Sequence, residues 1–217
     1  RDAAAAGLEP DDVGSILWQA THMVFAPGST SALGPRAQSA VVAAFSAAKE
    51  RGVMTIYDPM LHRGVWPEKT PQAARAAFEE LLPLMDLLVI SAPFATGQLL
   101  QRASATEAAN VAQRRGISQA VIRHGRRGCV IVDRDRIIEL PEPTEGSVRT
   151  SPLGEAVFNG ALMAALTDDE PLEEAARAAM RCADIMDEAA DTIANLPSAR
   201  ALMTAMRGED DDVPPAP

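Results

Sequence analysis

The sequence predicts an α/β protein in which a parallel sheet is covered by helices on both faces, making three layers. Short runs of β-branched and apolar residues alternate with longer segments whose apolar residues recur at helical spacing. Glycines and prolines stand between these segments, where turns are expected. Strands that alternate with helices pair in parallel through right-handed crossovers, and these crossovers place helices on both faces of the sheet.

The first half of the chain predicts a loop followed by alternating strands and helices. A proline followed by acidic residues predicts a short helical turn within 8–13. Ala37, Val41 and Phe45 recur at helical spacing, and Gly52 ends that helix. The elements predicted here are a strand at 21–25, a helix at 36–51, a strand at 53–57, a helix at 70–82 and a strand at 87–91.

The second half continues the alternation and then becomes helical. Gly116 ends a helix, and the segment from Gly125 to Gly128 predicts a turn between two β-branched runs. Arg134 and Asp135 separate two further apolar runs, which we expect to pair as a hairpin. The elements predicted here are a helix at 105–115, strands at 119–123, 129–133 and 136–140, and helices at 154–166, 171–190 and 198–206.

The composition is that of one globular domain. The chain has 217 residues, of which 47% are hydrophobic and 4% aromatic, and a chain of this length can bury a substantial core. Its formal net charge of −10 repels phosphate backbones and anionic lipids, so we expect neither nucleic acid nor a membrane surface as a partner. An anionic ligand would need a local positive cluster, which Arg123, Arg126 and Arg127 provide.

The cysteine pattern predicts buried, reduced thiols and a cytoplasmic location. Cys129 and Cys182 lie in different predicted elements, and neither has a neighbour at metal-binding spacing. No apolar run reaches the roughly 20 residues of a membrane span, and no signal-peptide pattern opens the chain.

The two ends of the chain differ in character from the middle. The sequence begins at Arg1 without a methionine, which suggests a fragment. Residues 208–217 are acidic and proline-rich, so we expect a disordered tail after one folded domain over 1–207.

Polar loops follow the predicted strands. Ligands of parallel α/β sheets bind beyond the carboxyl ends of the strands. The loops at 26–30, 58–66, 91–96 and 124–128 are therefore expected to converge there, together with residues 150–155.

Residues 147–160 look like a phosphate-binding turn that opens a helix. The amides and the positive dipole end of a helix N-terminus favour a transferring phosphate. Glu155 at that position could act as the general base on an attacking hydroxyl. Its alternative role is structural, because a carboxylate in the first turn stabilises the helix dipole by about 0.3–1 kcal/mol.

This segment resembles the Asp-Thr-x-Gly-Ala-Gly-Asp signature of ribokinase-like (PfkB) sugar kinases. Thr150, Gly154 and Ala156 agree with the signature, whereas Pro152 and Glu155 depart from it. Proline has no N–H to offer a phosphate. The extra methylene of glutamate moves the carboxylate by about 1 Å, and a misplacement on this scale can cost about 100-fold in rate.

Four more segments resemble the same family in order and spacing, so that the likeness covers roughly residues 15–206. Phe25–Leu33 resembles a segment ending in "SGITLAL", and Tyr57–Trp66 is similar to "FDPNYRPRLW". Val121–Val132 is similar to "VVKLGxxGALV", and the helical run over 160–206 also matches. These motifs place the resemblance nearest to the 2-keto-3-deoxygluconate kinase type.

The resemblance implies a ribokinase-like fold and transfer of the γ-phosphate of ATP to a hydroxyl of a small sugar or sugar acid. It makes Glu155 the catalytic base, with Leu153 and Gly154 in the anion hole. It also makes Arg123 and Gly125, together with Gly128 at the end of that turn, the contact to the nucleotide phosphates. The alternative for this last group is a tight turn between strands with solvated arginines.

On the sugar side, the resemblance implies Asp58, His62 and Arg63 as substrate residues, although His62 replaces the family's Arg and Arg63 lies one position along. ATP implies Mg²⁺. The 91–96 loop stands where the family has Asn-x-x-Glu but contains no carboxylate, so we assign no metal ligand, and both cofactors are in question.

Two hypotheses about function follow from these motifs. The first is a sugar kinase weakened by its altered motifs, and the second is an inactive ribokinase-like protein that serves as a binding or assembly module. The resemblance implies that the family's N-terminal third, which supplies strands and a lid over the sugar, is missing from this sequence. We therefore expect an exposed sheet edge that could pair with a second copy or a partner chain.

Overall fold

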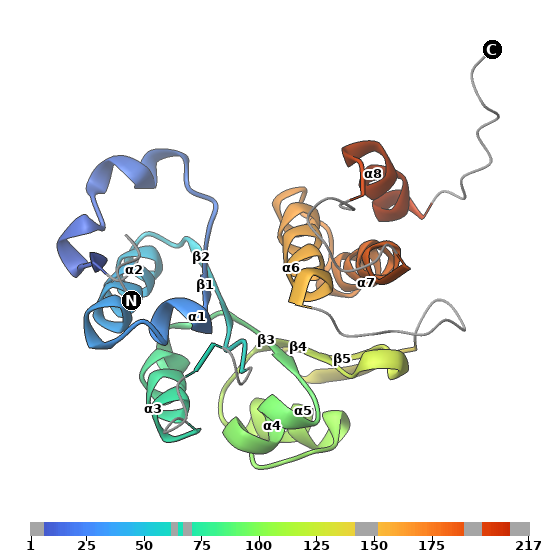
Figure 1. The fold of residues 1–217 in the computed structure, drawn as a ribbon, viewed down its shortest axis with the longest axis horizontal. Helices are drawn as coiled ribbons and strands as arrows, with labels where there is room; N and C mark the ends of the chain where they lie inside the picture. Colours follow the sequence, from blue (N-terminus) through green and yellow to red (C-terminus); the bar gives the residue numbers. More distant parts are fainter. Residues whose placement is uncertain (1–6, 62–64, 67–70, 142–151, 189–196, 209–217) are drawn as a thin grey trace. The chain divides into compact units, whose positions relative to one another are not determined.

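The computed structural model describes residues 7–61, 65–66, 71–141, 152–188 and 197–208. Its internal contacts group into two compact units. The first unit comprises residues 1–124 with 130–138, and the second comprises 125–129 with 139–217. Figure 1 draws the elements of both units along the chain.

A six-stranded sheet runs through the fold in the order β1-β2-β3-β4-β5-β6. The first four strands are parallel, as predicted for strands joined by helices. Only two residues join β5 to β6, a link far too short for a parallel crossover, so the predicted hairpin is confirmed and the sheet is mixed. The strands are β1 (Met23–Pro27), β2 (Met54–Asp58), β3 (Leu87–Ser91), β4 (Gln119–Arg123), β5 (Cys129–Asp133) and β6 (Arg136–Leu140).

The helices agree with the helical spacing of the sequence within a few residues at each end. The α-helices are α1 (Gly28–Ser31), α2 (Pro35–Glu50), α3 (Pro71–Leu81), α4 (Phe94–Leu99), α5 (Ala105–Arg114), α6 (Pro152–Thr167), α7 (Leu172–Glu188) and α8 (Ala199–Arg207). The short 3-10 turns are η2 (Pro10–Asp12), η3 (Ser15–Ala20), η4 (Leu82–Leu84) and η5 (Gly125–Arg127).

Local chemistry explains where several helices begin and end. The Ser104 hydroxyl accepts a hydrogen bond from the Glu107 amide at the start of α5, and the Ser198 hydroxyl accepts one from the Ala201 amide at the start of α8. Gly208 follows α8 with φ +67°, a left-handed conformation that ends a helix at little cost to glycine.

Among the short helical segments that were not predicted are α1, α4 and η3. The sequence predicts loops at 26–30 and 91–96, yet α1 begins in the first and α4 in the second, and η3 precedes β1. Each segment has at most six residues. A helix this short cannot display the repeated apolar spacing that identifies longer helices.

The central strands are buried on both faces. Consecutive residues of a strand point to opposite faces, and Leu87, Leu88, Val89 and Ile90 of β3 are each at most 1% exposed. An uninterrupted apolar run is typical of such a strand. This burial agrees with the α/β class that the sequence predicts.

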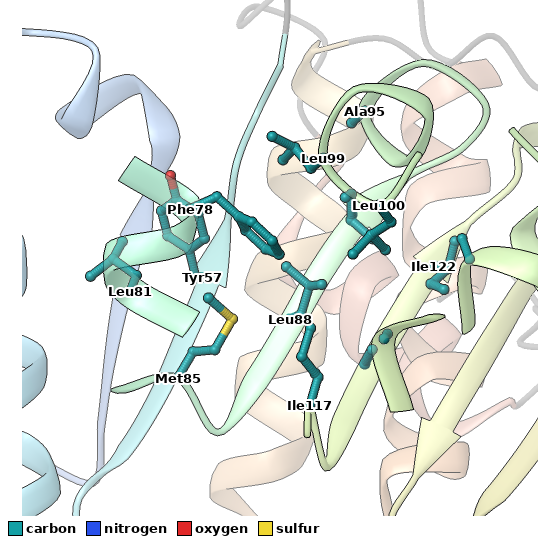
Figure 2. Close-up of a cluster of buried hydrophobic side chains, with 14 of the residues drawn as sticks. Tyr57, Phe78, Leu81, Met85, Leu88, Ala95, Leu99, Leu100, Ile117 and Ile122 are labelled. Carbon is teal, nitrogen blue, oxygen red and sulfur yellow. The ribbon is translucent and has the colours of Figure 1, made fainter. Parts of the chain in front are cut away.

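The core of the first unit packs helices closely onto the sheet. Phe78 and Leu81 of α3 lie in one buried cluster with Tyr57 of β2 and Leu88 of β3 (Figure 2). The buried face of α5 consists of alanines, whose small side chains allow the helix backbone to approach the strands. These alanines are Ala105, Ala108, Ala109 and Ala112.

Helices α6, α7 and α8 lie in the second unit. The faces along which α6 and α7 pack are rich in alanine, with Ala175, Ala176 and Ala179 of α7 fully buried. The Arg181 guanidinium of α7 donates to the carbonyls of Ala205 and Met206 and so satisfies the C-terminal end of α8.

Strand β1 is the first strand in the sheet order of the described chain, so one of its sides forms a sheet edge. Association through this edge stays a prediction. No helix of the described residues is both long and apolar enough to cross a bilayer. Residues 209–217, where we predict a disordered tail, lie outside the described part of the chain.

Gly28 lies where two strand ends approach each other closely. A Cβ at this position would lie 1.9 Å from the Pro59 carbonyl oxygen and 2.5 Å from its carbon, and both are backbone atoms. At Gly160, inside α6, a Cβ would meet nothing within 4 Å. The carboxyl ends of β1 and β2 can therefore approach this closely only because residue 28 has no side chain.

We expect Gly28→Ala to lower the free energy of unfolding by about 1–3 kcal/mol or more, since the backbone must shift to admit the methyl group. Gly160→Ala is the matched control and should raise that free energy by up to about 1 kcal/mol, because alanine favours a helix interior. Urea denaturation measures both. An unchanged midpoint for Gly28→Ala would contradict the close approach.

Cys129 and Cys182 are both free and buried, as predicted. Burial raises the pKa of the Cys182 thiol, an effect that the nearby charge of Arg181 partly offsets. A raised pKa leaves less thiolate at a given pH, and the thiolate is the reactive form.

We therefore expect iodoacetamide to label Cys182 slowly in the folded chain at pH 8 and much faster in urea. As the pH rises, labelling of the folded chain should reach half its maximal rate above the value of about 8.5 that is usual for free cysteine. Peptide mass spectrometry separates the two thiols. Equal labelling rates in the folded and unfolded chains would rule out this burial.

Candidate functional site

Three polar side chains meet at the carboxyl ends of neighbouring parallel strands. Asp58 ends β2, Ser91 ends β3 and Arg123 ends β4, and Ser91 and Arg123 are partners in the strand register. One Arg123 Nη lies 2.9 Å from Asp58 Oδ2, and Arg123 Nε donates to Ser91 Oγ at 3.1 Å. The sheet topology thus brings together residues that lie more than 30 positions apart in the chain.

This polar cluster is buried. Asp58 is 1% exposed and Arg123 is 8% exposed. Charged hydrogen bonds are strong in such surroundings, and removal of one partner leaves a buried charge uncompensated, at a cost of about 3–5 kcal/mol. The pair therefore constrains the geometry of the strand ends tightly.

Asp58 also shapes the loop that follows β2. Its Oδ1 atom accepts a hydrogen bond from the Met60 amide at 3.0 Å, in a turn where Met60 takes a positive φ of 41°. The Trp66 indole donates to the Pro59 carbonyl at 3.0 Å, and this contact is buried. The Asp58 and Trp66 side chains thus hold the backbone at Met60 and Pro59.

The residue before Asp58 is a buried phenol. Tyr57 is fully buried on β2, and burial raises the pKa of its hydroxyl above the usual value, an effect that the nearby charge of Asp58 reinforces. The hydroxyl therefore stays protonated throughout the neutral range and cannot act as a base there.

The structure places the predicted substrate residue Asp58 and the predicted phosphate contact Arg123 against each other. Direct contact of either residue with a ligand stays a prediction. The other predicted substrate residues, His62 and Arg63, lie outside the described residues.

Gly125 and Gly128 form a tight turn between β4 and β5. Both have positive φ angles, +55° and +79°, and the Gly128 amide donates to the Gly125 carbonyl at 3.0 Å. A tight turn between strands is the alternative that we gave to a nucleotide contact for this segment. Arg127 within the turn is exposed. Contact of these glycines with phosphate stays a prediction.

Glu155 lies in the first turn of α6, as predicted. The helix begins at Pro152, Leu153 is half-buried, and Gly154 and Glu155 are buried. Glu155 is only 6% exposed. The amides of a first turn point toward the helix N-terminus, so the carboxylate lies at the positive end of the dipole.

Asn159 is a residue of this helix that no motif singled out. It is 4% exposed and lies one turn after Glu155, on the same face of α6. A polar residue four positions after Glu155 in an otherwise apolar helix is the signal that could have identified it. Likewise, no motif gave a role to Ser91, which begins the loop predicted at 91–96.

The loop after β3 brings no carboxylate to the strand ends. Thr96, which stands where the family has a glutamate, is fully buried in α4, and its hydroxyl donates to the Pro93 carbonyl at 3.3 Å. Among the residues that the structure describes, no three His, Cys, Asp or Glu side chains are grouped as a metal site would require. The described side chains therefore form no group that could hold a metal ion by themselves.

Comparison with known proteins decides the family, because residues 3–199 match the profile of the pfkB family carbohydrate kinases. This chain belongs to that family. It is 29% identical over 183 residues to Fructokinase-2 of Zea mays and 27% identical over 183 residues to Fructokinase-2 of Oryza sativa subsp. japonica. Each alignment covers 81% of this chain and 53% of the plant protein.

Solved structures support the same fold. A fructokinase from Vibrio cholerae O395, with fructose, ADP and calcium ion bound, superposes with a TM-score of 0.75 at 21% identity, covering 92% of this chain and 64% of that one. A ribokinase from Arabidopsis thaliana, in complex with ribose and ATP, gives a TM-score of 0.70 at 18% identity, covering 91% and 59%. The predicted ribokinase-like fold is thus confirmed.

The chain spans about half the length of the plant fructokinases that it matches. The absence of the family's N-terminal third and the 2-keto-3-deoxygluconate subtype both stay predictions.

Proposed function

We propose that this pfkB-family chain takes part in ATP-dependent phosphorylation of a small sugar, with residues 1–207 acting as one ribokinase-like domain. The observation that carries the proposal is the position of Glu155, a buried carboxylate in the first turn of α6. It lies in the segment that resembles the family's catalytic signature. The fructokinase and ribokinase relatives favour a neutral ketose or pentose as the acceptor, and a sugar acid is the alternative.

In the proposed reaction, the acceptor hydroxyl loses its proton to the Glu155 carboxylate as its oxygen bonds to the γ-phosphorus. The bond between that phosphorus and the bridging oxygen breaks, and ADP leaves with the electron pair. The amides of Leu153 and Gly154 stabilise the charge on the transferring group, as the first turn of a helix does for phosphates. The turn from Gly125 to Gly128 provides backbone close to the nucleotide.

In this proposal, Mg²⁺ binds only together with the nucleotide. The described residues contain no group of three His, Cys, Asp or Glu side chains that could hold it, so most of its oxygen ligands would come from ATP and water.

A second candidate function is supported by the altered residues of the same segment. α6 begins with Pro152, which has no N–H for a phosphate, and Thr96 turns its hydroxyl to the Pro93 carbonyl. Both changes fall at positions that the resemblance assigns to binding of the nucleotide phosphates and their metal ion. A chain that keeps the fold and loses phosphate binding would act as a binding or assembly module.

Nucleotide binding separates the two candidates. If the site holds ATP, the melting temperature should rise saturably with ATP and rise further with Mg²⁺. Binding to the native state alone adds about 2.7 kcal/mol of stability at 100 times Kd. Sodium sulfate at matched ionic strength is the control. No shift at millimolar ATP would favour the binding module.

We expect Glu155→Gln to abolish sugar phosphorylation while the ATP affinity stays within about twofold, because the amide cannot take up the proton. Glu107→Gln is the matched control, since Glu107 also lies in the first turn of a helix but is exposed. Coupled ADP release measures turnover with fructose, ribose and 2-keto-3-deoxygluconate. Equal turnover in the wild type and Glu155→Gln would exclude Glu155 as the base.

A further inference from the structure

The Arg123 guanidinium ties together the ends of three strands. From β4, its Nε donates to Ser91 of β3 at 3.1 Å, and one Nη pairs with Asp58 of β2 at 2.9 Å. The rigid planar fork of arginine can make both contacts at fixed angles. Arg123 therefore sets the position of the Asp58 carboxylate relative to two other strands.

The second oxygen of Asp58 carries this constraint into the loop after β2. Oδ1 accepts from the Met60 amide at 3.0 Å, and Met60 has a φ of 41°, which a residue with a side chain rarely adopts. Between them, Pro59 is held through its carbonyl by the Trp66 indole and lies against Gly28. A continuous chain of contacts runs from Arg123 through Asp58 to the backbone at Met60.

The burial of Asp58 and Arg123 indicates that their contact is a lasting structural one. A phosphate that took over the Nη atom bound to Asp58 would compete with that carboxylate, which is only 1% exposed. Separating a buried carboxylate from its cation is costly, and this cost would reduce any gain from the phosphate. The contacts that Arg123 makes thus favour a role through the loop.

We propose that Arg123 is a positioning residue that acts through Asp58 on the 58–61 loop at the sugar side of the site, and not a direct contact to the nucleotide phosphates. The kinetic part of this inference rests on the proposed sugar-kinase function. Its structural part is independent of any activity.

The kinetic test compares Arg123→Met, Asp58→Asn and the double variant. Each single variant should raise the KM for the sugar at least 10-fold and leave the KM for ATP within twofold, and the double variant should be no worse than the worse single. Arg123→Lys should recover part of the loss, because lysine keeps the charge beside Asp58 but lacks the fork that also reaches Ser91. A raised KM for ATP in Arg123→Met, with Asp58→Asn unaffected, would overturn the proposal in favour of direct phosphate contact.

Hydrogen exchange of the Met60 amide supplies the activity-independent test. We expect faster exchange at Met60 in Arg123→Met and in Asp58→Asn, measured by NMR on the whole chain. Variants of the exposed Arg36–Glu9 ion pair, Arg36→Met and Glu9→Gln, are matched controls and should leave it unchanged. Unchanged exchange at Met60 in Arg123→Met would refute the positioning role.

The two proposals can fail separately. If the wild-type chain phosphorylates none of the sugars, the proposed function fails, while exchange at Met60 still decides whether Arg123 controls the loop. If a single variant does not fold, the double variant Asp58→Asn with Arg123→Met replaces it, because it removes both charges of the buried pair together. Protection of Met60 equal to wild type in that double variant would also overturn the proposal.

Discussion

Burial of the central strands on both faces is the constraint on which the rest of this structure depends. Every side chain of β3 from Leu87 to Ile90 is withdrawn from water, and each large apolar side chain contributes about 1.5–3 kcal/mol to folding. Strands buried in this way have no solvated face on which to carry polar residues. Alanine-lined helices such as α5 cover the strands closely, and the polar chemistry is left to the strand ends.

The ion pair of Asp58 and Arg123 shows what this arrangement costs and what it provides. Desolvation offsets much of the attraction between two buried charges, so the pair adds little net stability while it remains intact. The pair instead determines orientation, because a planar guanidinium and a carboxylate fix each other's geometry. A polar group at the end of each of three strands thereby defines the geometry of the carboxyl edge, where ligands of such sheets bind.

The chain combines a pfkB fold with a signature segment that differs from the family's at Pro152 and Glu155. The fold needs only apolar strands, small helix faces and turns at suitable places, and many sequences satisfy these demands. Phosphoryl transfer needs particular atoms in particular places, and Pro152 and Thr96 lack an amide proton and a carboxylate respectively. Likeness to fructokinases over about half of their length is therefore firm evidence for the family and weaker evidence for the reaction.

The sequence by itself determined the α/β class, four parallel strands, the β5–β6 hairpin and the boundaries of the longer helices, because these follow from local spacing of apolar residues and from turn chemistry. It also placed Glu155 in the first turn of a helix. It could not predict α1, α4 or η3, because segments of at most six residues show no periodicity. Only the tertiary structure paired Asp58 with Arg123, 65 positions apart, because strand order and register, rather than any local pattern, decide which strand ends meet.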